Sequence, residues 1–599
     1  MSPTRSSEGP SRPSAKGGFA RGRPVFRLRM GFIIIAMVLS FFGARLIQLQ
    51  GVDPQSYASL AAQEGAAEMD LPAARGDIVD RNGAALADSV TGRMVIADPS
   101  LTADDATALA TLLSDRLDLD YASTLDRLRG RKEGSRFEYV ARRVPATLAT
   151  DTLAEVRDAG YQGITLEDDP IRDYPGGDVG ANLVGFVGTD GPLAGFELTF
   201  DKLLAGKDGK ATWRSTSSKG VRIPLADSTL REPQHGQTLR LTIDRDLQWF
   251  TQKVISQTLQ QYRAESASAI VLDTRTGEIL ALADAPTFDA NDPTNADSDD
   301  LGARSISDVY EPGSVAKVLT ASALIDAGKS FPRQKFKVPG ILHRQDRPIG
   351  DWFDHDTIRL TLAGIIAKSS NIGTVLAADA FTPQQLVDYL RKFGLGSRTN
   401  IGVRGETAGI LTPGDVMTSQ TKDRVTFGQS MSVNVVQMAS AVATIANDGV
   451  RVSPSIIQGQ AVTDEGVTVG TDVATRSRVI SAKAAKATAR MMERVVDPEA
   501  GVAPRAQVEG YLVAGKTGTA QRVAADGSGY DGSTSVSFAG FAPADDPRFV
   551  VYVVVHDPQG EAGGGSVGGP AFSRIMGQAL SRYGVPQTGG KPSRLPVEW

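Results

Sequence analysis

Residues 311–317 read Glu-Pro-Gly-Ser-Val-Ala-Lys and stand directly before an apolar run in this 599-residue chain. Pro312 and Gly313 are typical of the start of a helix. On that helix Ser314 and Lys317 lie one turn apart on the same face, so the lysine amine can reach the hydroxyl. A lysine whose pKa is lowered by burial can act as the base for a serine nucleophile. The spacing therefore predicts a Ser–Lys pair, although by itself it also fits an ordinary capped helix with a surface lysine.

Strand-like segments lie on both sides of this stretch, and helical patterns lie between them. The strand-like segments are 269–273, 278–283, 511–514, 535–541 and 549–556. The helical patterns cover 316–327 and 360–379, and the second has a polar break at 369–371. Strands early and late with helices between them predict one antiparallel sheet packed by helices, an α+β fold.

Two further motifs follow in the same domain. Ser369-Ser370-Asn371 offers a hydroxyl and an amide in a turn, and Lys516-Thr517-Gly518-Thr519 ends the strand expected before it. Small residues such as Gly518 are expected to let a ligand backbone approach that strand closely. The ordered set S-x-x-K, S-D-N and K-T-G is the one used by penicillin-binding proteins and class A β-lactamases, and Ser369-Ser370-Asn371 stands in the place of S-D-N here. Three motifs in this order predict an acyl-transfer site.

The N-terminal segment predicts a membrane anchor. Residues 1–29 are rich in Ser, Pro, Gly and Arg, so we expect a disordered basic tail, and the apolar run that follows predicts a transmembrane helix over 30–50. The basic flank places the tail in the cytoplasm and exports the remainder. A cleaved signal peptide is disfavoured because no A-x-A-like site follows the run. A buried helix of a soluble protein is the third interpretation.

Composition excludes several kinds of chemistry. The chain has no cysteine and four histidines, and its net charge is −5. Disulfides, thiolate nucleophiles and cysteine-based metal sites are therefore excluded, and we expect no metal, no cofactor and no nucleic-acid partner. Gly564–Gly568 formally matches the G-x-S-x-G nucleophile elbow, but no acid and histidine follow in triad order, so we interpret Ser566 as a chance match.

The exported part divides into segments of different character. Residues 51–230 mix short strands, short helices and many turns without a nucleophile beside a base, so we expect a non-catalytic pedestal there. The catalytic domain is expected over 231–585. The last segment, 586–599, contains Gly-Gly and several prolines, which predicts a flexible tail.

From the membrane span to about residue 585 the chain resembles the class B penicillin-binding proteins, specifically the FtsI-type division transpeptidases. The matching stretches, by first and last residue, are Arg75–Gly83, Arg172–Pro175, Leu272–Ala281, Ala303–Ser314, Ala514–Gln521 and Ser537–Pro543. Departures such as Val315, where threonine is common, do not touch the catalytic groups. The resemblance implies a transmembrane helix, an elongated pedestal and a penicillin-binding domain.

The resemblance also implies a catalytic mechanism in which each motif residue has a role. Ser314 attacks the penultimate D-alanine carbonyl of a peptidoglycan stem peptide, and Lys317 takes the serine proton. Ser369, with Lys516 beside it, relays a proton to the leaving amine. Asn371 orients the donor peptide. An amine from a second stem peptide then resolves the acyl-enzyme and forms the crosslink.

The remaining expected roles concern substrate binding. Thr517, Gly518 and Thr519 form the substrate-binding strand, and the two threonines hold the terminal carboxylate with Lys516. The backbone N–H groups of Ser314 and Thr519 form the oxyanion hole. The substrate backbone pairs with this strand by β-augmentation.

The resemblance also implies partners and leaves alternatives. Peptidoglycan stem peptides and β-lactams are the expected ligands, and an FtsW-like membrane glycosyltransferase with other divisome proteins are the expected partners at the septum. A bifunctional class A enzyme would need a glycosyltransferase domain, and a β-lactamase would not be expected to carry an anchor and a pedestal. An elongation-type transpeptidase and a catalytically idle divisome scaffold remain as alternatives.

Overall fold

The structure is a computed structural model. It describes residues 24–48, 66–130, 137–188, 191–214, 229–345, 347–524, 529–560, 562–587 and 589–599. Most of the predicted basic tail, the last two residues of the predicted span and residues 51–65 lie outside the described residues. The chain forms two compact units, Met1–Leu71 with Gly209–Glu232, and Pro72–Asp208 with Pro233–Trp599.

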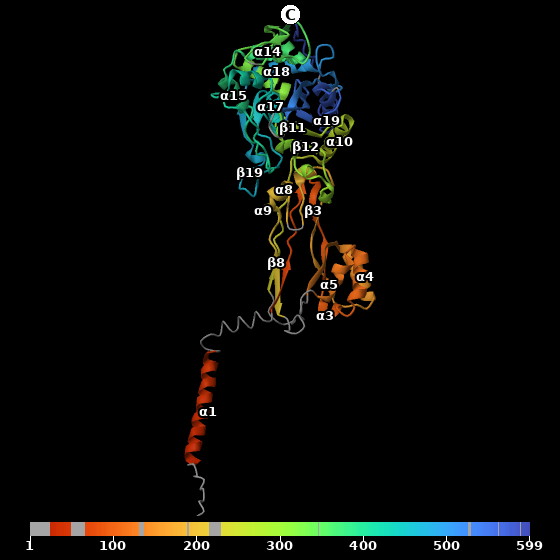
Figure 1. The fold of residues 1–599 in the computed structure, drawn as a ribbon, viewed down its shortest axis with the longest axis vertical. Coiled ribbons are helices and arrows are strands. Elements are labelled where there is room, and N and C mark those ends of the chain that lie inside the picture. Colours follow the sequence, from red (N-terminus) through yellow and green to blue (C-terminus); the bar gives the residue numbers. More distant parts are fainter. Residues whose placement is uncertain are drawn as a thin grey trace, which may run out of the picture. The chain divides into compact units, whose positions relative to one another are not determined.

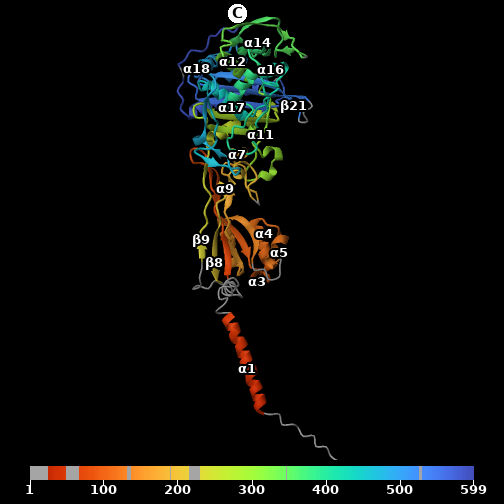
Figure 2. The same ribbon diagram turned by 90° about the vertical axis from the view of Figure 1, so that its left-hand side faces the viewer.

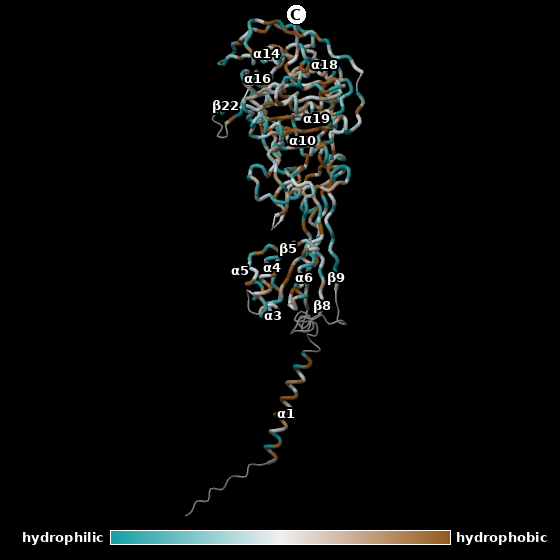
Figure 3. Tube along the Cα trace, turned by 90° about the vertical axis from the view of Figure 1, so that its right-hand side faces the viewer, coloured by the Kyte–Doolittle hydropathy of each residue, from teal (hydrophilic) through white to brown (hydrophobic). Residues whose placement is uncertain are grey.

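The first unit contains the apolar helix α1, Pro24–Ile47, and a small sheet. The segment Val25–Ile47 is long and apolar enough to cross a membrane, and hydrophobic residues dominate it in Figure 3. The helix begins before the predicted start at Met30, because proline is well tolerated at the first helical position and arginine is a good helix former. In the small sheet β8 (Gly209–Arg214) pairs antiparallel with both β1 (Ala66–Leu71) and β9 (Thr229–Arg231).

The second unit begins with two small sheets. One has the strand order β10-β2-β3-β7 and the other has the order β5-β4-β6. Their strands are β2 (Ile78–Val79), β3 (Ala85–Val90), β4 (Gly92–Ala97), β5 (Glu138–Pro145), β6 (Ile164–Asp168), β7 (Ile171–Asp173) and β10 (Leu239–Arg240). The helices α4 (Ala106–Leu117), α5 (Tyr121–Arg129) and α6 (Ala146–Asp158) enclose a separate small core with the β5-β4-β6 sheet.

A buried ion-pair cluster lies beside the first of these sheets. The side chain of Glu197 is fully buried and accepts from Arg75 Nε at 2.5 Å and from Arg172 Nε at 2.6 Å. Arg75 also pairs with Asp201 at 2.6 Å. Because a buried carboxylate is costly unless it is paired, these contacts explain two arginines that the sequence motifs single out.

The large core of this unit is built on a five-stranded sheet with the order β12-β11-β23-β22-β21. All its neighbouring strands are antiparallel. The strands are β11 (Ser266–Asp273), β12 (Ile279–Ala285), β21 (Ala514–Val523), β22 (Tyr530–Ala542) and β23 (Phe549–His556). The predicted α+β fold with an antiparallel sheet is confirmed.

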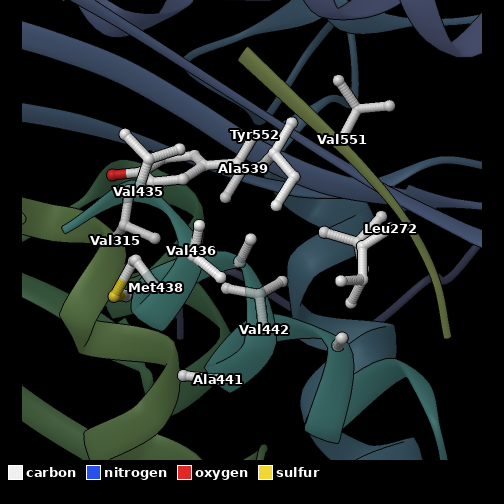
Figure 4. Packing of buried hydrophobic residues seen from close by; sticks show 14 of the residues in the cluster. Leu272, Val315, Val435, Val436, Met438, Ala441, Val442, Ala539, Val551 and Tyr552 are labelled. Atoms are coloured by element: carbon white, nitrogen blue, oxygen red, sulfur yellow. The ribbon is translucent and has the colours of Figure 1, made fainter. Parts of the chain in front are cut away.

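Helices cover both faces of this sheet (Figures 1 and 2). The helices α10 (Arg245–Tyr262) and α19 (Gly569–Arg582) pack on each other and on one face. The helix α17 (Val435–Ala446) packs on the other face and is buried at every position. Figure 4 shows Val436 and Val442 of α17 facing sheet residues that include Ala539 and Leu272.

The helical segment predicted at 316–327 is confirmed as α12, Ala316–Asp326. The pattern predicted at 360–379 forms two helices, α13 (Leu362–Lys368) and α14 (Asn371–Ala378), which are separated at the predicted polar break. The strand expected to end before Lys516 instead runs through the motif as β21, because Lys516 and Thr519 pair in register with Ala539 and Val536 of β22.

The prediction of a flexible tail is wrong for the last residues of the chain. Thr361 N donates to Val597 O at 3.0 Å, and Glu598 forms a β-bridge with Leu360. The Lys335 ammonium lies 4.7 Å from the centre of the Trp599 ring. Glycine and proline content predicts a loose segment, but backbone pairing with β16 (Ile358–Thr361) outweighs that local tendency.

Candidate active site

A cavity of about 560 Å³ lies where the three sequence motifs meet. The motif residues in its wall are Ser314, Ser369, Asn371, Thr517 and Thr519. Its other lining residues are Gly313, Trp352, Phe427, Gln429, Val502 and 562–566. Residues far apart in the sequence therefore share one pocket, as the acyl-transfer prediction requires.

Ser314 is positioned by a close approach between its loop and strand β21. It lies in a short 3₁₀ turn, Gly313–Val315, that leads into α12. Gly313 has φ +53, and a Cβ there would lie 2.7 Å from Thr519 O. Gly313 N donates to Gly428 O at 3.0 Å, which fixes the loop from the other side. Glycine is needed because both the positive φ and the contact exclude a side chain.

Lys317 is fully buried behind the nucleophile loop. Its Nζ donates to Ser369 O at 2.6 Å and to Ser369 Oγ at 3.4 Å. Burial lowers the pKa of Lys317 to about 7, and the negative charge of Asp351 opposes that shift. A substantial fraction of this amine is therefore neutral near neutral pH, as a general base requires.

Lys516 reaches the same hydroxyl from β21. Its Nζ lies 2.8 Å from Ser369 Oγ, and it also donates to Thr517 O at 3.0 Å. Burial and the charge of Lys317 lower the pKa of Lys516 well below its ordinary value. Two ammonium groups on one buried hydroxyl repel each other, so the charge of either amine disfavours protonation of the other.

Ser369 lies at a special backbone position between the two lysines. It ends α13 with φ +59, in the left-handed region, and this turn separates α13 from α14. A non-glycine residue in this region is costly and persists only where its surroundings hold it. The bend directs the Ser369 hydroxyl toward both amines, and this contact could not be read from the motif itself.

The remaining motif residues have defined contacts. Asn371 Nδ2 donates to Gly350 O at 2.9 Å. Thr517 and Thr519 line the pocket from β21, which is an edge strand of the sheet and is therefore open to pairing with an added strand. A Cβ at Gly518 would lie 2.9 Å from Pro312 O and 2.3 Å from Ser537 Oγ. Gly518 thus makes room for the protein's own chain, which differs from the expectation of room for a ligand.

Several site residues were missed by sequence reasoning. Asp351 and Trp352 approach the Ser369–Asn371 turn from a segment without any motif, and Phe427 adds an aromatic wall. Ser566, interpreted as a chance match, does line the pocket. Its hydroxyl donates to Gly563 O at 3.1 Å and accepts from Gly563 N at 3.0 Å, so it has a local structural role.

Comparisons with known proteins match two regions. Residues 267–577 match the family model of the penicillin-binding protein transpeptidase domain, and residues 70–192 match that of the penicillin-binding protein dimerisation domain. The first region contains every residue of the predicted site.

Similar proteins extend over nearly the whole chain. Penicillin-binding protein PbpB of Mycolicibacterium smegmatis is 36% identical over 96% of this chain and 92% of its own length. Peptidoglycan D,D-transpeptidase FtsI of Escherichia coli is 32% identical over 94% of this chain and 92% of its own length.

Solved structures show the same likeness. Penicillin-binding protein 3 of Mycobacterium tuberculosis in complex with aztreonam aligns with a TM-score of 0.67 and 32% identity, over 89% of this chain and 100% of that chain. A peptidoglycan synthetase from Bifidobacterium adolescentis aligns with a TM-score of 0.70 and 31% identity, with the same coverage.

Proposed function

The chain belongs to the penicillin-binding protein transpeptidases, and from this premise we propose that it is a serine-type peptidoglycan D,D-transpeptidase. One observation carries the assignment to these residues: two fully buried lysines, Lys317 and Lys516, converge on the hydroxyl of Ser369 in the pocket that contains Ser314. This arrangement provides a nucleophile, a neutral amine as base and a route for a proton.

In the first half-reaction Ser314 Oγ bonds to the carbonyl carbon of the penultimate D-alanine, and its proton passes to Lys317 Nζ. The amide bond to the terminal D-alanine then breaks. The leaving amine takes a proton through the Ser369 hydroxyl, which both lysine amines contact. A base with a pKa near the working pH suits both directions of this transfer.

The pocket wall provides the remaining interactions. The backbone N–H groups of Ser314 and Thr519 stabilise the oxyanion, and each such donor is typically worth about 3 kcal/mol. Asn371 orients the donor peptide. Thr517 and Thr519 hold the terminal carboxylate beside Lys516, and the substrate backbone pairs with the edge of β21. An amine of a second stem peptide then attacks the acyl-enzyme and releases Ser314.

The ligands, partners and location that we propose are those expected for the family. β-Lactams acylate Ser314 in place of the stem peptide, and the enzyme acts in septal wall synthesis with an FtsW-like polymerase and other divisome proteins. The helix α1 anchors the chain in the cell membrane. The basic residues that precede its apolar part keep the N-terminus in the cytoplasm and the catalytic domain outside.

Fluorescent penicillin labelling tests the proposal directly. We expect a stable covalent band for the full-length protein and none for Ser314→Ala, because that variant lacks the nucleophile. Ser566→Ala removes another hydroxyl of the same pocket and should keep the band. A band in folded Ser314→Ala would contradict the assignment of the nucleophile, and no band in the folded wild type would favour the idle scaffold.

A further inference from the structure

Asp351 belongs to none of the sequence motifs, yet its buried carboxylate contacts the turn that carries Ser369 and Asn371. We propose that Asp351 is a positioning residue: it holds this turn, and with it the Ser369 oxygens that Lys317 contacts, and it supplies a buried negative charge to the site. The inference rests on the proposed function, because it gives Lys317 the role of base.

The contacts of Asp351 and Ser370 together satisfy the start of α14. Its Oδ1 accepts from Asn371 N at 2.6 Å and from Ile372 N at 3.0 Å, and its Oδ2 accepts from Ser370 Oγ at 2.6 Å. Ser370 Oγ in turn accepts from Gly373 N at 2.8 Å. The unpaired N–H groups at the helix start are thereby satisfied by one carboxylate and one hydroxyl.

The neighbours of Asp351 hold the turn from both sides. Asn371 Nδ2 donates to Gly350 O at 2.9 Å, and the Trp352 indole donates to Lys368 O at 2.9 Å. The segment 350–352 therefore bonds to the residues on either side of Ser369. A strained Ser369 needs such support from its surroundings, and these contacts provide it.

The charge of Asp351 favours the protonated form of Lys317. Its side chain is 0% exposed, so water screens it little. This negative charge opposes the burial that lowers the pKa of Lys317 to about 7. Without the carboxylate, the protonated form of Lys317 would lose a favourable interaction and its pKa would fall further.

The other titratable groups of this cluster come from four elements. Lys317 belongs to α12, Lys516 to β21 and Lys368 to the end of α13, whereas the described sequence of α14 contains none. His355 lies on the segment of Asp351, with Nε2 3.1 Å from Asp351 Oδ2 and Nδ1 2.5 Å from Asp356 O. Both ring nitrogens of His355 therefore lie within hydrogen-bond distance of an oxygen atom, and one of these oxygens belongs to the Asp351 carboxylate.

The test is the pH dependence of acylation by a chromogenic β-lactam, measured on the full-length protein in detergent. In the wild type we expect the rate to rise through the pKa of Lys317. We call this rise of the rate with pH the acid limb. In Asp351→Asn the acid limb should move to lower pH by roughly one unit, because removal of the opposite charge lowers the pKa of Lys317 further. The plateau rate should also fall roughly tenfold, because Ser370 loses its charged acceptor.

Two variants separate charge from structure. Ser370→Ala removes one bond to Asp351 but keeps the carboxylate, so the rate should fall while the acid limb stays in place. Asp354→Asn removes an exposed charge from the same segment and should leave the limb unmoved. An unmoved limb in folded Asp351→Asn, or an equal move in Asp354→Asn, would overturn the proposal.

A folding defect in Asp351→Asn does not leave the question open. Asp351→Glu retains the charge, so its acid limb should lie at the same pH as that of the wild type, even if its acylation rate is lower. An acid limb displaced to lower pH in this variant would overturn the proposal. The proposed function fails separately, because it fails if the wild type is not acylated at all. The role of Asp351 is tested only in an acylated wild type, by the three outcomes named above.

Discussion

Lys317 and Lys516 place their amines on one hydroxyl, that of Ser369, with Nζ–Oγ distances of 3.4 and 2.8 Å. Both lysines are fully buried. The pair therefore acts as one proton-sharing unit, in which the protonation of either amine affects the other. The predictions that follow test this unit and the framework that holds it.

Replacing the base should abolish acylation without unfolding the protein. In Lys317→Met the aliphatic part of the side chain is largely preserved, and we expect the acylation rate to fall roughly 100- to 10,000-fold, the usual contribution of a general base. Lys329→Met, one turn beyond α12, is the matched control. The rate of β-lactam acylation and the melting temperature are measured together, and near-normal acylation of Lys317→Met would exclude the lysine as base.

The buried lysine also makes stability depend on pH. The pKa of Lys317 is lowered in the folded protein to about 7, whereas in the unfolded chain it is near the ordinary value of 10.5. Between these values the unfolded state binds more protons, so this group's contribution to the free energy of unfolding rises as pH increases through the window. Below pH 7 the contribution no longer changes.

The measurement is the difference in melting temperature between Lys317→Met and the wild type as a function of pH. We expect the variant to be the more stable protein near neutral pH, because it no longer buries an amine, and we expect its advantage to shrink toward alkaline pH. A constant difference across this range would show that the folded-state pKa of Lys317 is not lowered.

Gly313→Ala should distort the nucleophile loop. The new methyl group would meet Thr519 O at 2.7 Å in a backbone with φ +53, so we expect a loss of about 1–3 kcal/mol in stability and a strong loss of acylation. Gly328→Ala, with φ +68 and nothing within 4 Å, is the control for positive φ alone. Equal acylation rates in the two variants would contradict the close approach of the loop to β21.

The C-terminal residues should stabilise the catalytic domain. Thr361 caps the start of α13: its side chain accepts from Gly364 N at 3.0 Å, and its own N–H donates to Val597 O. Deleting residues 597–599 should therefore lower the melting temperature and slow acylation, since α13 carries Ser369 at its other end. Deleting only Trp599 removes its ring contact and its bonds to Arg359 O and Leu360 O, but it leaves the bond from Thr361 N to Val597 O and should have the smaller effect. Unchanged stability in the longer deletion would contradict the packed tail.

Local sequence determined several features of this protein. The helix that follows Ser314, the polar break before Asn371, the apolar strands of the sheet and the apolar helix near the N-terminus all follow from residue patterns that act over a few positions. The order of the three motifs predicted an acyl-transfer site and its candidate residues, and the resemblance over further stretches predicted the family. These features could be predicted because hydrophobic periodicity and turn-forming residues act through neighbouring residues.

Tertiary structure alone decided how those residues work together. Ser369 lies 52 positions from Lys317 and 147 from Lys516, and only the packing of α12, α13 and β21 brings them together. The lowered pKa of Lys317, the contacts of Asp351 and the packing of Val597 have no local signal. Burial and long-range pairing produce them, because the desolvation of a charge and the satisfaction of a backbone group depend on what the rest of the chain places around them.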